Sequence, residues 1–130
     1  MSAAIPTVKL EATNNTNGYD YEPQITKLGI GGGYAVAWQG YDGTDHNIYT
    51  QQFNANGTTT GFTPVQLEAI GNTTGTDEDP QITVIDNTGK YVVTWTGYQR
   101  NPNDSSIFVQ QFNANGTTTG YTPVLLESIG

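Results

Sequence analysis

Bulky apolar side chains alternate with smaller ones along two short stretches of the chain, residues 34–39 and 91–96. In the first stretch, Tyr34, Val36 and Trp38 alternate with small or polar residues, and the second stretch repeats this pattern. A period of two is typical of a β-strand that buries one face. Both stretches are therefore predicted strands that carry their aromatic side chains on one face.

Three further predicted strands accompany each of these two. They cover residues 24–28, 47–53 and 64–69 in the first half of the chain, and residues 81–85, 107–112 and 123–128 in the second. Pro23 and Pro80 stand immediately before the first predicted strand of each set. Proline has no N–H to donate, so it is expected to lead a strand rather than lie inside it. An Asn-Gly pair follows each third strand, at residues 56–57 and 115–116, and predicts a tight turn there.

The chain is a tandem repeat. Residues 51–71 recur almost unchanged as residues 110–130, and Tyr34 corresponds to Tyr91, 57 residues later. Two additional residues raise this offset to 59 from Ile48 onward. Residues 8–12 match residues 65–69 and 124–128, so the last strand occurs three times. We expect an extra N-terminal strand and connector in residues 1–21, the first repeat in residues 22–71, and a connector with the second repeat in residues 72–130.

Four antiparallel strands in sequence order, repeated along the chain, predict an all-β fold. Two four-stranded units resembling β-propeller blades, with the extra N-terminal strand, fit this pattern best, and a β-sandwich is the alternative. A propeller ring has about four to eight blades, so two units cannot close alone. We therefore expect a homo-oligomer that completes a ring, or a piece of a longer array.

The chain is strongly acidic, with a formal net charge of −8 and only four Lys and Arg residues. This balance disfavours nucleic acid and anionic lipid as partners. No apolar run reaches the length of about 20 residues that a membrane span needs, and the first residues do not have the pattern of a Sec signal. The absence of Cys excludes disulfides, thiolate metal sites and a Cys nucleophile within this chain.

Residues 33–43, followed by residues 47–57, carry a family resemblance. A strand with glycine, an aromatic residue, valine and tryptophan leads to an Asp/Gly-rich loop, a second strand and an Asn-Gly turn. This order resembles repeats of large bacterial secreted and surface adhesin-like proteins associated with RTX repeats. The resemblance implies a non-catalytic extracellular module, secreted or on the cell surface, often with calcium. Gln52 and Asn54, and Gln111 and Asn113 in the second repeat, stand where that family tends to have Arg and Asp.

Two acidic segments are candidate calcium sites. Asp42, Asp45 and Asn47 place carboxylate and amide oxygens in one short loop, and Asp77 and Asp79 lie in the connector between the repeats. Ca²⁺ prefers such oxygen ligands, although the spacing is not that of an EF-hand. The alternatives are that the first loop uses these side chains to form its turn and that the second is a solvated acidic loop.

Aromatic residues beside amides are the candidate ligand-binding residues. Trp38, Trp95, Tyr41, Tyr98 and Asn47 form this set. A sugar can stack its C–H face on an aromatic ring while amides bond its hydroxyls, so a glycan or another cell-surface ligand is the expected partner. The alternative for the two tryptophans is that they are core residues of the strands.

The sequence thus predicts a lectin-like binding or adhesion module without catalytic residues. A structural self-assembling repeat is the main alternative, favoured by the near-identical units and the redundant terminal strand. Glycoside hydrolysis is the remaining alternative, and it would require two carboxylates that face each other at about 5–10 Å.

Overall fold

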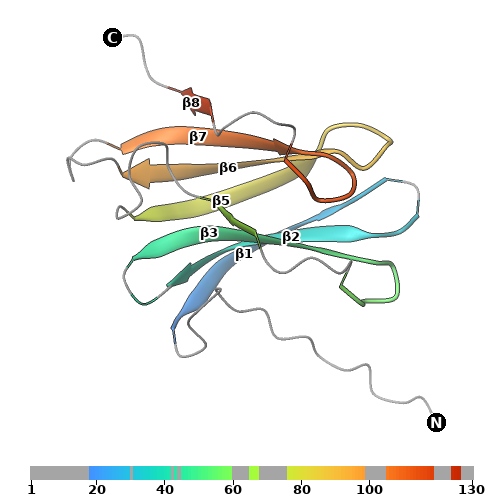
Figure 1. The fold of residues 1–130 in the computed structure, drawn as a ribbon, viewed down its shortest axis with the longest axis horizontal. Helices are drawn as coiled ribbons and strands as arrows, with labels where there is room; N and C mark the ends of the chain where they lie inside the picture. The colour runs from blue at the N-terminus through green and yellow to red at the C-terminus, as the bar shows by residue number, and fades with distance from the viewer. Residues whose placement is uncertain are drawn as a thin grey trace.

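The computed structural model describes residues 18–29, 31–41, 43, 45–59, 65–67, 76–98, 105–118 and 124–126, and all regular structure among them is β (Figure 1). The all-β prediction is confirmed. Each strand pairs antiparallel with its neighbour in sequence, which gives two sheets, one per repeat. The first sheet contains β1 (Asp20–Lys27), β2 (Tyr34–Tyr41), β3 (His46–Phe53) and β4 (Val65–Leu67). The second contains β5 (Asp77–Val84), β6 (Tyr91–Tyr98), β7 (Ser105–Phe112) and β8 (Val124–Leu126).

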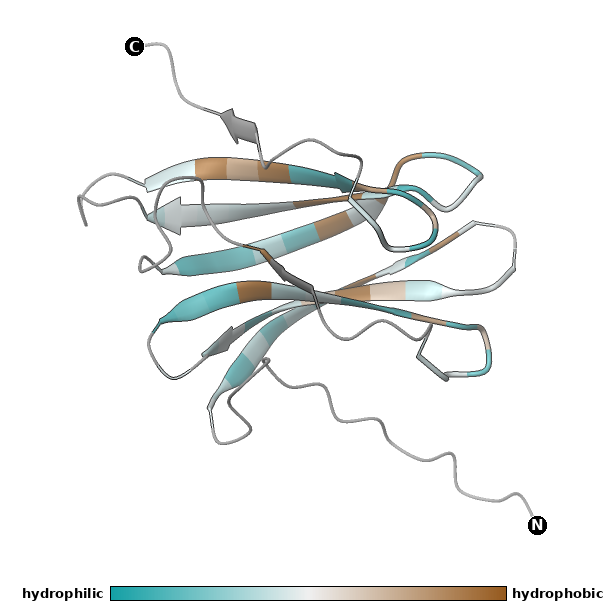
Figure 2. Ribbon diagram, viewed as in Figure 1, coloured by the Kyte–Doolittle hydropathy of each residue, from teal (hydrophilic) through white to brown (hydrophobic). Residues whose placement is uncertain are grey.

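Each sheet is built on three strands of eight residues, and a three-residue strand pairs at its outer edge. Figure 2 shows short apolar segments alternating with polar ones along the long strands. The Asn-Gly turns after β3 and β7 are confirmed, since Gly57 and Gly116 both have a φ of 88°. The part of the chain that the structure describes includes no helix long and apolar enough to cross a membrane.

The predicted aromatic faces are confirmed by the register of the strands. Trp38 lies opposite Tyr49, and Tyr34 lies opposite Phe53, so these side chains share a face and stack at centroid distances of 5.8 and 5.0 Å. The second sheet repeats both stacks, with Trp95 against Phe108 at 5.8 Å and Tyr91 against Phe112 at 4.8 Å. We call this side of each sheet its aromatic face, and the other side its non-aromatic face.

The two prolines do not lie where the sequence placed them. Pro23 and Pro80 lie inside β1 and β5, which begin at Asp20 and Asp77, so the expectation that each proline leads its strand is wrong. The register of each strand shifts around its proline, and the preceding residue has a φ of 56°. These shifts mark β-bulges, where the extra residues leave the hydrogen-bonding ladder and the missing proline N–H costs no ladder bond.

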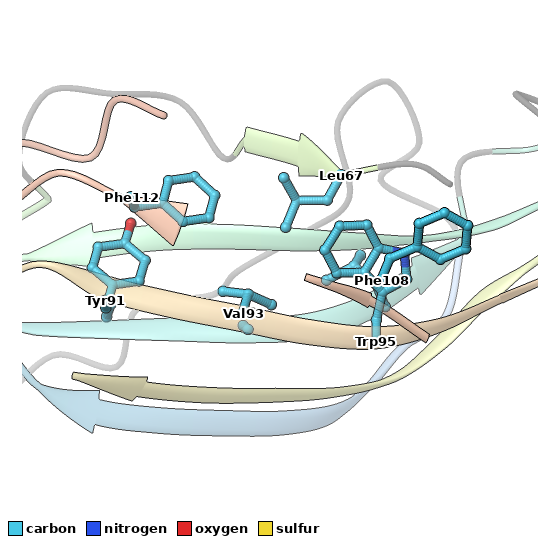
Figure 3. Packing of buried hydrophobic residues seen from close by; sticks show 9 residues of the cluster. Leu67, Tyr91, Val93, Trp95, Phe108 and Phe112 are labelled. Atoms are coloured by element: carbon cyan, nitrogen blue, oxygen red, sulfur yellow. The ribbon is translucent and has the colours of Figure 1, made fainter. Parts of the chain in front are cut away.

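The two sheets pack through unlike faces. The shared core joins non-aromatic-face residues of the first sheet to aromatic-face residues of the second (Figure 3). The first sheet contributes Ala35, Ala37, Ile48 and Leu67, and the second contributes Tyr91, Val93, Trp95, Phe108 and Phe112. The strand β5 lies against β1, β2 and β3. The small side chains of Ala35 and Ala37 in β2 leave room for the rings of the second sheet. Their counterparts in β6 are the larger Val92 and Thr94, so this difference between the repeats has a packing reason.

Candidate functional site at the contact between the sheets

A tryptophan–aspartate bond ties the first two strands of each sheet together. Trp38 donates from Nε1 to Oδ1 of Asp20 at 3.0 Å, and Trp95 donates to Oδ1 of Asp77 at the same distance. Trp95 and Asp77 are each only 1% exposed, whereas Asp20 is exposed. Asp77, a candidate calcium ligand in the sequence, is therefore placed in the core as a hydrogen-bond acceptor.

The candidate calcium residues are dispersed among several environments. Asn47 donates to Oδ1 of Asp45 at 3.1 Å, and both residues are buried at the start of β3. Asp79 is exposed in the bulge of β5, and Asp42 lies outside the described residues. Across the ranges that the structure describes, no group of three Asp, Glu, His or Cys side chains is arranged to hold a metal ion.

The candidate ligand-binding residues are likewise divided. Trp38, Trp95 and Asn47 are buried, with their side chains in the packing of the sheets. Tyr41 and Tyr98 are half-buried at the ends of β2 and β6. Only the two tyrosines therefore lie where a solute can reach part of the ring.

The ends of β2 and β6, where Tyr41 and Tyr98 lie and which we call the first and second corners, have different neighbouring side chains. The ring of Tyr41 lies 5.2 Å from that of His46, which lies 5.6 Å from that of Tyr21, so three aromatic rings gather at the first corner. At the second corner, a hydrogen bond with Glu78 and the charge of that carboxylate raise the pKa of Tyr98. Glu78 is the counterpart of Tyr21, and the repeats therefore do not carry two copies of one site.

The cluster at the first corner was not predicted from the sequence. Tyr41 and His46 face each other across the β2–β3 hairpin, which a short connection between two predicted strands could have suggested. Tyr21 joins them because β1 extends four residues further toward the N-terminus than its apolar pattern indicated. Burial, followed by the charges of nearby carboxylates led by Glu78, raises the pKa of Tyr21.

Gln39 connects the two sheets, because one end of its amide bonds a residue of the first sheet and the other end bonds the second sheet. Its Nε2 atom donates to the hydroxyl of Tyr21 at 2.8 Å, and its Oε1 atom accepts a bond of 3.3 Å from the backbone N–H of Asp79. The Gln39 side chain is buried, and the bulge in β5 turns that N–H out of its own ladder. The bulge thus has a structural use, since it supplies the donor that fixes the two repeats against each other.

Gln52 makes the second polar connection. Its Nε2 atom donates to the backbone carbonyl of Ala114 at 2.7 Å, which joins β3 to the turn after β7. Beside it, a Cβ placed on Gly29 would lie 2.8 Å from the carbonyl oxygen of Asn87. The turn after β1 and the turn after β5 are therefore in close contact, and Gly29 permits this approach with a φ of +61°.

Tyr91 lies at one end of the core shared by the two sheets, where its ring stacks on Phe112 (Figure 3). Burial raises the pKa of Tyr91, and the nearby hydroxyl of Thr50 acts in the opposite direction. Thr50 belongs to the first sheet, so the phenol of Tyr91 lies against that sheet, and its burial there favours the neutral form.

Two of the surface hollows lined by described residues border the sheets. One of about 230 Å³ lies by the turns and is lined partly by Gln52 and Gly89, and the other, of about 170 Å³, lies by Tyr21 and Val36. Both are below the range of about 300–1,000 Å³ that is typical of small-molecule sites. The contact between the two sheets is more extensive than either hollow, and it contains the aromatic core and the hydrogen bonds of Gln39 and Gln52.

The chain matches no protein-family model, and comparison with curated proteins and with solved structures gives no match.

Proposed function

We propose that this chain is a non-catalytic structural repeat module whose function is to stack one β-sheet unit on the next. One observation carries this proposal, the packing of the non-aromatic face of the first sheet on the aromatic face of the second. Contact between unlike faces of equivalent units is head-to-tail, and head-to-tail contacts can continue into rings or open arrays.

We regard each sheet as blade-like within the same proposal. The first strands, β1 and β5, lie against each other, and each sheet continues away from them in sequence order. Radial repetition of sheets around a centre uses this kind of arrangement. On the strength of the family resemblance, we place the module outside the bacterial cell, with calcium as a further hypothesis for its acidic loops.

The placement of the candidate side chains supports stacking over ligand capture. Trp95 and Asp77 bond each other in the core, and Gln39 and Gln52 join the sheets. A polar group that is buried must keep its partner, because leaving a buried donor or acceptor unpaired costs about 1–3 kcal/mol. Three of the candidate sugar-binding residues, Trp38, Trp95 and Asn47, are thus engaged in the packing of the sheets.

Binding of a glycan or another cell-surface ligand is the second candidate function, and the cluster of Tyr21, Tyr41 and His46 favours it. A glycan array probed with the full chain tests this candidate. Glycans that bind the wild-type chain and the Tyr98→Ala variant but do not bind the Tyr41→Ala variant would support a site at the first corner. Equal retention by both variants would place the binding elsewhere and remove the support for this site.

Hydrogen exchange of backbone amides tests the stacking function. We expect Gln52→Ala to lower the protection of β2 and β6 together by about 0.5–1.5 kcal/mol, because the lost bond connects the two sheets. Gln111→Ala is the matched control, since Gln111 is the exposed counterpart of Gln52 in the second repeat. Both variants are compared at concentrations where the chain is monomeric. Loss of protection in the first sheet alone would show two independent sheets and would contradict the proposal.

A further inference from the structure

The non-aromatic face of the second sheet is open where its counterpart in the first sheet is closed. Ala35 and Ile48 are 0% exposed, because the second sheet covers them. Their counterparts are Val92, which is half-buried, and Ile107, which is 43% exposed. The same repeat surface is therefore covered once and uncovered once among the described residues.

The aromatic face of the first sheet shows the opposite difference along β1 and β2. Ile25 is 66% exposed, whereas its counterpart Ile82 packs against the shared core. Val36 is half-buried, whereas its counterpart Val93 is 0% exposed. The Ile25 and Val36 part of the aromatic face is therefore accessible in the first sheet, whereas Trp38, Tyr49 and Phe53 on the same face are at most 3% exposed.

The open face of the second sheet has the composition of an interface. Its β6 and β7 residues are all uncharged: Val92, Thr94, Thr96, Ile107, Val109 and Gln111. In a chain with a net charge of −8, the uncharged β6–β7 part of this face is where two copies can approach without direct repulsion, and Glu78 of β5 lies beside it, opposite Thr96. Depletion of charge is also the compositional mark of the centre of protein interfaces.

The hydrogen-bonded pair that joins β3 to the turn after β7 has exposed counterparts in the repeats. Gln52 donates to the carbonyl of Ala114 across the two sheets. The counterparts are Gln111 on the open face of the second sheet and Ala55 at the end of the first sheet, and both are exposed. One copy thus presents the donor and another copy presents the acceptor, in the positions that the intrachain bond uses.

We propose, on the basis of the stacking function, that a second copy of this chain docks head-to-tail on the first. The open non-aromatic face of the second sheet packs on the β1–β2 part of the aromatic face of the first sheet of the other copy. Gln111 of one copy bonds the carbonyl of Ala55 of the other. Each copy adds two sheets, so about two to four copies would give the four to eight sheets of a propeller ring.

The contact between copies differs from the contact within the chain at several repeat positions, one of which is that of Gly29. Gly29 allows the close approach of the two turns inside the chain, and its counterpart is Asp86. Within the chain, a Cβ on Gly29 would lie 2.8 Å from the carbonyl oxygen of Asn87. The side chain of Asp86 would meet the facing backbone of the other copy in the same way if the two turns approached as closely. The contact between copies is therefore wider at this turn and weaker than the contact within the chain.

Paired blocking variants test the docking and its polarity. Thr94→Arg introduces a charge on the open face of the second sheet, and Ile25→Arg does so on the aromatic face of the first. Sedimentation velocity over a concentration series is expected to show multiples of 14.0 kDa for the wild-type chain and monomers for each variant alone. An equimolar mixture of the two variants keeps one intact pair of faces and is expected to form a dimer and nothing larger.

The control and the contrary outcomes are well separated. Thr59→Arg is the matched control, because Thr59 and its counterpart Thr118 are both exposed and so lie outside the intrachain contact. It is expected to associate as the wild type does, and circular dichroism checks that each variant is folded. Association of Ile25→Arg alone would show a contact between like faces and overturn the proposal. A wild-type chain that stays monomeric at every concentration would also overturn it, while joint protection of both sheets would still support intrachain stacking.

Discussion

The indole of Trp95 donates a 3.0 Å hydrogen bond to the carboxylate of Asp77, and both side chains are 1% exposed. The bond joins β5 to β6 at the point where the second sheet meets the first. A carboxylate can be buried only where hydrogen bonds replace its water, and a bond to an ionised acceptor is stronger than one between neutral groups. The same pair in the first sheet, Trp38 and Asp20, has its carboxylate at the surface.

The two pairs give a matched test of what burial adds to this bond. We expect Asp77→Ala to lower the free energy of unfolding by about 1.5–3 kcal/mol, because it leaves a buried indole N–H without its acceptor. Asp20→Ala is expected to cost less, since water can reach that site. Urea denaturation of the full chain measures both values. Equal costs would mean that the burial of Asp77 does not contribute to the strength of its bond.

Ile48 and Ile107 allow the same comparison for apolar packing. Ile48 is 0% exposed in the shared core, whereas its counterpart Ile107 is 43% exposed. We expect Ile48→Ala to cost about 2–5 kcal/mol, as cavity-forming substitutions in cores do. Ile107→Ala is expected to cost about 0.5 kcal/mol when the chain is monomeric. Similar losses from both substitutions in thermal or urea unfolding would contradict the assignment of inner and outer sheet faces.

Much of the strand structure could be predicted because it follows from local patterns. The alternation of Tyr34, Val36 and Trp38 fixes which side chains share a face, and repetition extends the result to the second sheet. The Asn-Gly turns followed from backbone preferences of two residues. The role of the β5 bulge could not be predicted in this way, because the bond from the backbone N–H of Asp79 to Gln39 depends on a strand from the other repeat.

The candidate site residues depended on facts that no local pattern contains. Asp77 reads as a connector carboxylate in the sequence, and only the pairing of β5 with β6 brings it to Trp95. Gln52 and Gln111 lie in segments of identical sequence, residues 51–61 and 110–120, yet one bonds Ala114 and the other is exposed. The difference is their position in the stack, since each repeat has one neighbour on one side only within the chain.

Gly29 provides a test of the close contact between the two turns. We expect Gly29→Ala to destabilise the chain more than Gly57→Ala does. Both glycines have positive φ, +61° and +88°, so an alanine at either site carries a backbone cost of about 1–2 kcal/mol. At Gly29 the new Cβ would also lie 2.8 Å from the carbonyl of Asn87, whereas nothing lies within 4 Å at Gly57. Equal unfolding midpoints for the two variants would show that the turns are not in firm contact.

Tyr91 gives the contact between the sheets a defined response to alkaline pH. Burial raises the pKa of Tyr91 above the value of 10.0 that the unfolded chain provides, so the folded state holds this proton more tightly. The resulting stability is fully present below pH 10.0 and is lost as the pH rises through the folded pKa. We expect the free energy of unfolding to fall in this window and Tyr91→Phe to flatten the fall. Part of the fall in the free energy of unfolding remains in Tyr91→Phe, because the pKa values of Tyr21 and Tyr98 are also raised. Urea titrations across this pH range measure the slope, and an unchanged slope in Tyr91→Phe would mean that the phenol is not held neutral by the first sheet.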